Sequence, residues 1–161
     1  MQYRAQALFS GPLPNRGMLV FTKPSCLGSG DYSENSVIFP AHSFNVGRVN
    51  FLIDERNVLP RPYEPKWGPD GNFIRAYQSL LNVTNQSTDP HGGSLDHNSF
   101  GLDFGVFAVR LRGFEGKETG TVSIEVGFDE AVPECISALF IAEFKSCVTI
   151  DSNRMVQQFD Y

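Results

Sequence analysis

Residues 104–128, FGVFAVRLRGFEGKETGTVSIEVGF, decide the fold class of this chain. They contain two alternating apolar runs, 106–111 and 121–126, joined by a polar connector that is rich in glycine. Alternation with a period of two is typical of a β-strand that has one buried and one exposed face. The sequence therefore predicts two strands joined as a β-hairpin.

The same alternation assigns side chains to the buried faces. On these faces we expect six apolar residues: Phe107, Val109, Leu111, Val122, Ile124 and Val126. Arg110 and Glu125 would then meet on the exposed face of the hairpin, if its register allows it.

Composition indicates a single globular domain that covers residues 1–161. The chain is 41% hydrophobic and 19% charged, and its 14 Phe, 15 Gly and 10 Pro favour short strands joined by many turns. A net charge of −5, with only 13 scattered Lys and Arg, argues against nucleic acid as a direct ligand. No run approaches the roughly 18 apolar residues of a membrane span.

The three cysteines, Cys26, Cys135 and Cys147, are an odd number without a Cys-x-x-Cys pair. They predict no disulfide framework, and we interpret them as buried thiols that act as small hydrophobic side chains.

Further strands are predicted before the opening stretch. Residues 3–9 and 18–22 are apolar runs separated by a Gly/Pro-rich break, and they are predicted to be antiparallel neighbours. Residues 36–39 form a short apolar run, and 46–54 form another strand. In the first strand Tyr3, Ala5, Ala7 and Phe9 should share one face, and in the last strand the face of Val49, Phe51 and Ile53 should be buried.

Residues 59–70 hold four prolines together with Tyr63 and Trp67. Because aromatic side chains in such a stretch usually fold back onto the body, we predict an ordered surface excursion rather than a flexible linker. Apolar residues at helical spacing then predict a helix over 72–81, with Asn72 as its N-cap, followed by a long polar loop over 82–98.

The C-terminal region allows two interpretations. Apolar residues between 136 and 148 recur at three and four positions, as in a helix, but the β-branched residues at 148–150 also suit a strand. Residues 155–161 form a terminal strap, and its Phe159 and Tyr161 would pack on the body or contact a neighbour.

The sequence contains few candidates for catalytic or metal-binding residues, and we expect no enzyme. His42, His91 and His97 follow no zinc spacing. Asp96 in the polar loop and Asp103 nearby could offer carboxylates to Ca²⁺ at subunit contacts. The alternative, a solvated loop without metal, is favoured, and no other cofactor is indicated.

The stretches 7–20, 106–114, 121–126 and 130–134 resemble the middle and late strands of nodavirus-like and related icosahedral RNA-virus capsid proteins. This resemblance covers about a third of the chain, and it implies a viral jelly roll. Those proteins carry an Arg/Lys-rich arm that neutralises packaged RNA. This sequence shows none, so another chain or segment would supply that charge.

We therefore expect an antiparallel β-sandwich with one or two short helices, serving as a subunit or processed portion of an icosahedral capsid. It would be assembled in the host cytoplasm, found in the virion, and joined to copies of itself or to other capsid proteins. The expected interface residues are Tyr63, Trp67, Phe159 and Tyr161. An alternative is a carbohydrate-binding module in which Tyr63, Trp67 and Tyr77 stack on sugars. A third hypothesis is an enzyme that uses the loop at 91–103.

Overall fold

The computed structural model describes residues 2–24, 44–68, 71–86, 96–102, 104–132, 135–150 and 155–160. Its elements in chain order are β1 (Gln2–Pro12), β2 (Arg16–Thr22), β3 (Val46–Ile53), β4 (Arg56–Asn57), α1 (Ile74–Val83), α2 (His97–Leu102), β5 (Phe107–Arg110), the 3₁₀ helix η3 (Phe114–Gly116), β6 (Thr119–Phe128), β7 (Ser137–Glu143), β8 (Ser146–Ile150) and β9 (Val156–Asp160).

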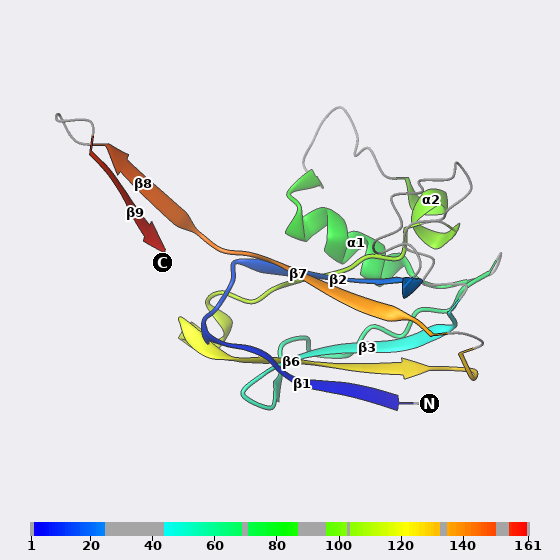
Figure 1. Cartoon of the computed structure of the whole chain (residues 1–161). Coiled ribbons are helices and arrows are strands. Elements are labelled where there is room, and N and C mark those ends of the chain that lie inside the picture. The colour runs from blue at the N-terminus through cyan, green and yellow to red at the C-terminus, as the bar shows by residue number, and fades with distance from the viewer. Residues whose placement is uncertain are drawn as a thin grey trace.

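Two antiparallel sheets face each other (Figure 1). The first sheet has the strand order β1-β6-β3-β4 and the second has the order β5-β2-β7. Helices α1 and α2 lie over the side of the second sheet that faces away from the first (Figure 1). The predicted antiparallel β-sandwich with one or two short helices is thereby confirmed, while the finer assignment as a jelly roll stays a prediction.

The core lies between the two sheets and is rich in aromatic rings. All six apolar residues assigned to the buried faces of the opening stretch are at most 2% exposed. Val49, Phe51 and Ile53 of β3 are 0% exposed, as predicted. The rings of Phe21 and Phe107 meet edge to face at 6.2 Å. The alternation of apolar residues therefore identified the core correctly.

The predicted hairpin is wrong, because β5 and β6 belong to different sheets. β5 pairs with β2, whereas β6 pairs with β1 and β3. Between them Gly113 (φ 77°), Glu115 (φ 51°) and Gly116 (φ 76°) adopt left-handed backbone conformations that redirect the chain across the sandwich. The two apolar faces thus pack against each other instead of lying side by side. Arg110 and Glu125 do not meet.

The pairing predicted for the first two strands is also wrong, since β1 lies in the first sheet and β2 in the second. The chain crosses between the sheets at Leu13, which is 3% exposed, and no proline N–H is available at Pro12 or Pro14 to continue a ladder. Strand β1 is irregular as well. A register shift lies between Ala5 and Phe9 and Ala7 has a φ of 52°, so the alternation predicted for residues 3–9 is interrupted there.

Helix α1 begins later than predicted. Its N-cap is Phe73 and not Asn72, and no side chain bonds to the first turn. Asn72 is held in an extended bridge opposite Lys66, which keeps it out of the helix. α2 (His97–Leu102) begins inside the region predicted as a polar loop, so residues 97 and 98 are helical instead. At the C-terminus the strand interpretation is the correct one, because β7 pairs with β2 along its whole length.

Candidate assembly surface

The last two strands form a hairpin apart from the sandwich. β8 pairs with β9 from Ser146 opposite Asp160 to Ile150 opposite Val156. Within the described residues neither strand joins a ladder of the two sheets, and the hairpin projects away from the body (Figure 1). The predicted terminal strap is therefore one strand of an extended arm, which we call the β8–β9 arm.

The arm exposes apolar side chains to solvent. Val148 is 56% exposed and Ile150 is 69% exposed, and they share one face of β8 because they are two residues apart. Met155, just before β9, is 64% exposed. A two-stranded hairpin on its own is at best marginally stable in water. This arm therefore has the composition and the geometry of an element that is stabilised by a further surface.

Two apolar side chains between the arm and the sandwich are also exposed. Ile141 on β7 is 55% exposed, and Phe144 at the base of the arm is 48% exposed. The ring of Phe144 also packs edge to face on Phe9 of β1 at 5.8 Å. We call Ile141, Phe144, Val148, Ile150 and Met155 together the assembly surface. Large exposed apolar areas typically mark interaction sites, and these side chains are the candidates for one on this chain.

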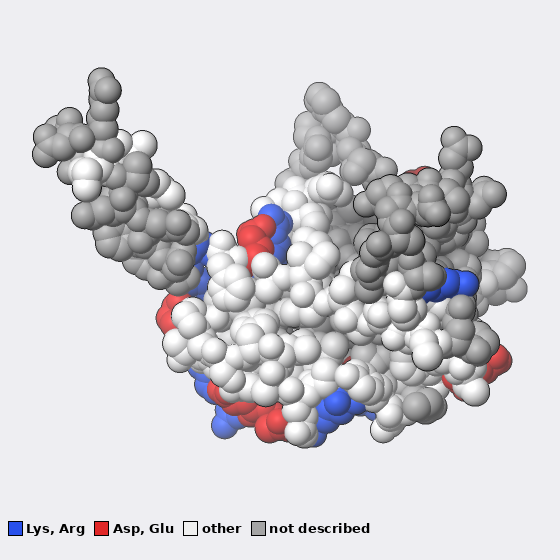
Figure 2. Space-filling view, viewed as in Figure 1, with Lys and Arg blue, Asp and Glu red and all other residues white. Residues whose placement is uncertain are grey.

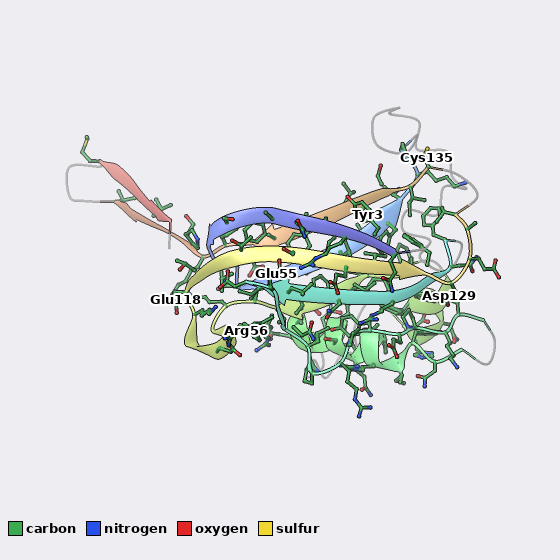
Figure 3. The ribbon with its side chains drawn as sticks, turned by 90° about the horizontal axis from the view of Figure 1, so that it is seen from below. Tyr3, Glu55, Arg56, Glu118, Asp129 and Cys135 are labelled. Carbon is green, nitrogen blue, oxygen red and sulfur yellow. The ribbon has the colours of Figure 1, made fainter. Side chains whose placement is uncertain are left out.

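The outward side of the first sheet has the opposite character. Figure 2 shows Lys, Arg, Asp and Glu atoms gathered along this side, and Figure 3 shows Glu55 and Arg56 pointing from it. Arg4 pairs with Glu55 and Glu125, and Lys117 Nζ lies 2.6 Å from Asp54 Oδ2. The hydrogen bond from Lys117 lowers the pKa of Asp54, with a further contribution from the Thr121 amide. Paired charges of this kind suit a solvated face.

Two of the four aromatic residues predicted at the interface, Tyr63 and Trp67, fold back onto the body, as the proline-rich stretch suggested. Tyr63 is 2% exposed, and its hydroxyl lies 2.8 Å from the Ala108 carbonyl oxygen and 2.6 Å from Ser79 Oγ. Burial raises the pKa of the Tyr63 phenol. The ring of Trp67 stacks on Phe73 at 5.7 Å. The chain's own core therefore accounts for these two rings, and they give no reason to expect a neighbour there.

The other two predicted interface residues are Phe159 and Tyr161, and only the backbone of Phe159 is described. Phe159 lies in β9, where its backbone is opposite Cys147. The side chain of Phe159 and all of Tyr161 lie outside the described residues. Their contacts with a neighbour stay a prediction.

The candidate calcium ligands are not shown to converge. Asp96 precedes α2, where its carboxylate accepts hydrogen bonds from the Ser99 amide at 2.9 Å and the Ser99 hydroxyl at 3.0 Å. These bonds lower the pKa of Asp96. Asp103 lies outside the described residues, and in the described part no three His, Cys, Asp or Glu side chains are grouped for a metal. Asp96 caps a helix, and calcium binding stays a prediction.

The remaining chemical candidates are dispersed. His97 stacks on Phe73 at 4.5 Å, while His42 and His91 lie outside the described residues. Cys135 is exposed, so the prediction of a buried thiol is wrong for it, because it precedes β7 at the edge of the second sheet. Cys26 and the side chain of Cys147 lie outside the description.

Comparisons of this chain with protein-family models, with curated proteins and with solved structures give no match. No helix in the described part of the chain is long and apolar enough to cross a membrane. The case for a function therefore rests on the residues themselves.

Proposed function

We propose that this chain is a structural subunit of an icosahedral virus capsid, joined to its neighbours through the β8–β9 arm and the adjoining surface of the sandwich. The observation that carries the proposal is the arm, which projects from a body with its own core and exposes Val148, Ile150 and Met155. On this proposal the partner is another copy of the chain or a related capsid protein, and the assembly is the virion, made in the host cytoplasm.

The energetics favour a covered arm. Burying a Val, Ile or Met side chain contributes about 1.5–3 kcal/mol relative to leaving it exposed. The three exposed side chains of the arm therefore gain several kcal/mol when a neighbour covers them. Since ordering the arm costs conformational entropy, an arm without a partner has little to stabilise it.

The body itself supplies the second line of support. Antiparallel sandwiches with short helices are the architecture that the resemblance to icosahedral RNA-virus capsid proteins implies. The charged outer side of the first sheet suits a solvated surface, whereas the assembly surface lies along β7 and the arm. A subunit of this kind can bind its neighbours through the apolar arm while the charged side of its first sheet stays in contact with water.

The carbohydrate-binding alternative loses its main argument. A sugar platform needs exposed aromatic faces around one groove. Tyr63 is buried, and the face of Trp67 is stacked on Phe73. Tyr77 packs edge to face on Phe100 at 5.6 Å. Tyr63 contacts Phe51 of β3 and Phe107 of β5, so these rings form part of the packing of the body and its two helices.

The test is a double substitution on the arm, Val148→Asp with Ile150→Asp. Two carboxylates on the contact face should abolish particles and higher oligomers of the purified chain, because charges in an apolar contact lose hydration without a partner. Light scattering after size exclusion and electron microscopy measure the outcome. The matched control is Ile74→Asp, which places the same charge on an isoleucine of α1 that is 47% exposed, and it should assemble normally.

Two outcomes would overturn the proposal. One is a wild-type chain that stays monomeric at high concentration. The other is a double variant that assembles as well as Ile74→Asp, because the arm would then have no part in assembly.

A further inference from the structure

The second sheet carries a row of charged side chains at the end where β2 begins. Arg16 of β2 lies directly opposite Arg110 of β5 on one side and opposite Glu143 of β7 on the other. Residues directly opposite each other on antiparallel strands project from the same side of a sheet. Two guanidinium groups are therefore held side by side, an arrangement that is unfavourable between like charges.

This row lines a hollow on the α1 side of the second sheet. The hollow has a volume of about 410 Å³ and is lined by Asn15, Arg16, Val83, Asn85, Arg110, Arg112 and Glu143. Small-molecule sites typically enclose about 300–1,000 Å³. Among the described residues, its wall thus combines three guanidinium groups and two side-chain amides with one carboxylate. Figure 2 shows acidic and basic atoms in contact near the base of the β8–β9 arm.

Two of these arginines, Arg16 and Arg110, donate hydrogen bonds to the C-terminal end of α1. Arg16 Nη1 donates to the Val83 carbonyl oxygen at 2.9 Å, and Arg110 Nη2 donates to the Asn82 carbonyl oxygen at 3.0 Å. Cations at this end of a helix are favourable because its carbonyl groups carry partial negative charge. Capping therefore explains why arginines lie here, but it engages only some of their donors.

The three arginines differ in how far they are neutralised. Arg16 is paired with Glu143, with 2.7 Å between Nε and Oε2. Arg112 is paired through Nε with Glu118 at 3.1 Å. Arg110 has no carboxylate partner among the described residues, where it bonds through Nη2 to the Asn82 carbonyl and to Asn85 Oδ1. Its Nε and Nη1 donors, and both terminal nitrogens of Arg112, remain available within that part of the chain.

We propose that this hollow is a binding site for a phosphate-type oxyanion, with Arg110 as its principal ligand and Arg112 and Arg16 as supporting cations. The planar guanidinium group matches the oxygens of a phosphate through two parallel hydrogen bonds. A bound dianion or monoanion would also relieve the repulsion between Arg16 and Arg110. The ligand is either a free phosphate or a phosphate of a nucleic-acid backbone, since both present the same oxygens.

The first test measures binding of inorganic phosphate to the intact chain by calorimetry at constant ionic strength. The wild type should bind saturably, and Arg110→Gln should weaken binding by about tenfold or more, because it removes a charge-assisted pair of hydrogen bonds. The matched control, Arg56→Gln, removes an exposed arginine of β4 that pairs with Glu115, and it should bind as the wild type does.

A second variant separates anion binding from the structural role of Arg110. Asn85→Asp places a carboxylate where Oδ1 already accepts from Arg110 at 3.0 Å, and aspartate tolerates the local φ of 60°. This substitution should maintain or raise the melting temperature while it lowers phosphate affinity by about tenfold. A purely structural role for Arg110 predicts no loss of binding in this variant.

The source of the phosphate is decided by a second probe, a short single-stranded oligoribonucleotide. Binding of inorganic phosphate identifies a site for free phosphate, whereas Arg110-dependent binding of the oligonucleotide alone identifies a backbone contact. The proposal is overturned if neither probe binds, or if Arg110→Gln and Asn85→Asp bind as the wild type does. The assembly variant Val148→Asp with Ile150→Asp should keep phosphate binding, so the two proposals fail separately.

Discussion

The sandwich body and the β8–β9 arm are built from similar residues but bury them differently. In the body, strand β6 keeps Val122, Ile124 and Val126 at no more than 2% exposure, whereas in the arm Val148 and Ile150 are more than half exposed. Both segments are β-branched strands. The difference teaches that the body supplies its own core, and that the arm has the same kind of side chains without a surface to cover them.

The largest expected effect comes from placing one charge in each region. Ile124→Asp should abolish the folded protein, because an unpaired buried carboxylate costs several kcal/mol against a total stability of roughly 5–15 kcal/mol. Val148→Asp should leave the melting temperature of the body nearly unchanged. Circular dichroism during thermal unfolding measures both. Equal melting of the two variants would remove the distinction between body and arm.

A smaller loss of stability is expected when the hydroxyl of Tyr63, which links several elements of the body, is removed. Tyr63 pairs through its backbone with Val49 of β3, and its hydroxyl reaches the Ala108 carbonyl of β5. Tyr63→Phe should lower the unfolding free energy by about 1–3 kcal/mol, because a buried carbonyl loses a partner. Urea denaturation measures it. Tyr3→Phe is the matched control, since Tyr3 is 55% exposed, and it should change stability by less than about 0.5 kcal/mol.

The smallest expected effect is on the pH dependence of the stability of the body. The folded state lowers the pKa of Asp54 and of Asp96. Each carboxylate therefore stabilises the body at pH values above its ordinary pKa of about 3.9, and this contribution is lost as the pH falls through the lower folded pKa. The variant Asp54→Asn with Asp96→Asn should lose less stability between neutral and acidic pH than the wild type. Melting temperatures over a pH series measure this, and an unchanged acid limb would contradict it.

The sequence predicted burial well and pairing poorly, for one physical reason. Alternation reports which side of a strand is apolar, and this identified Val109 and Ile124 as core residues. Two strands with apolar faces can lie side by side or pack face to face, and alternation is the same in both cases. The left-handed residues around Gly113 decided between them, and Glu115 gives no sequence signal for such a conformation.

The sites depended even more on tertiary structure. The β-branched residues near Val148 indicated a strand, but nothing local showed that this strand leaves the sandwich. The hollow at Arg110 was missed because the sequence shows neither that Arg16 lies opposite Arg110 nor that both reach the end of α1. By contrast, the proline-rich stretch was predicted correctly to return its aromatic rings to the body, since buried aromatic area outweighs the cost of ordering such a segment.

The central position of β6 in the first sheet has a consequence for synthesis of the chain. β6 lies between β1 and β3, so the Ala7 amide reaches its partner, the Ser123 hydroxyl, only after most of the chain has been made. Sheets built from such distant contacts fold slowly, and strand edges that wait for a partner are prone to aggregate. On the ribosome, β1 and the edge of β3 that faces β6 must therefore wait for their partner until β6 emerges, although β3 can already pair with β4.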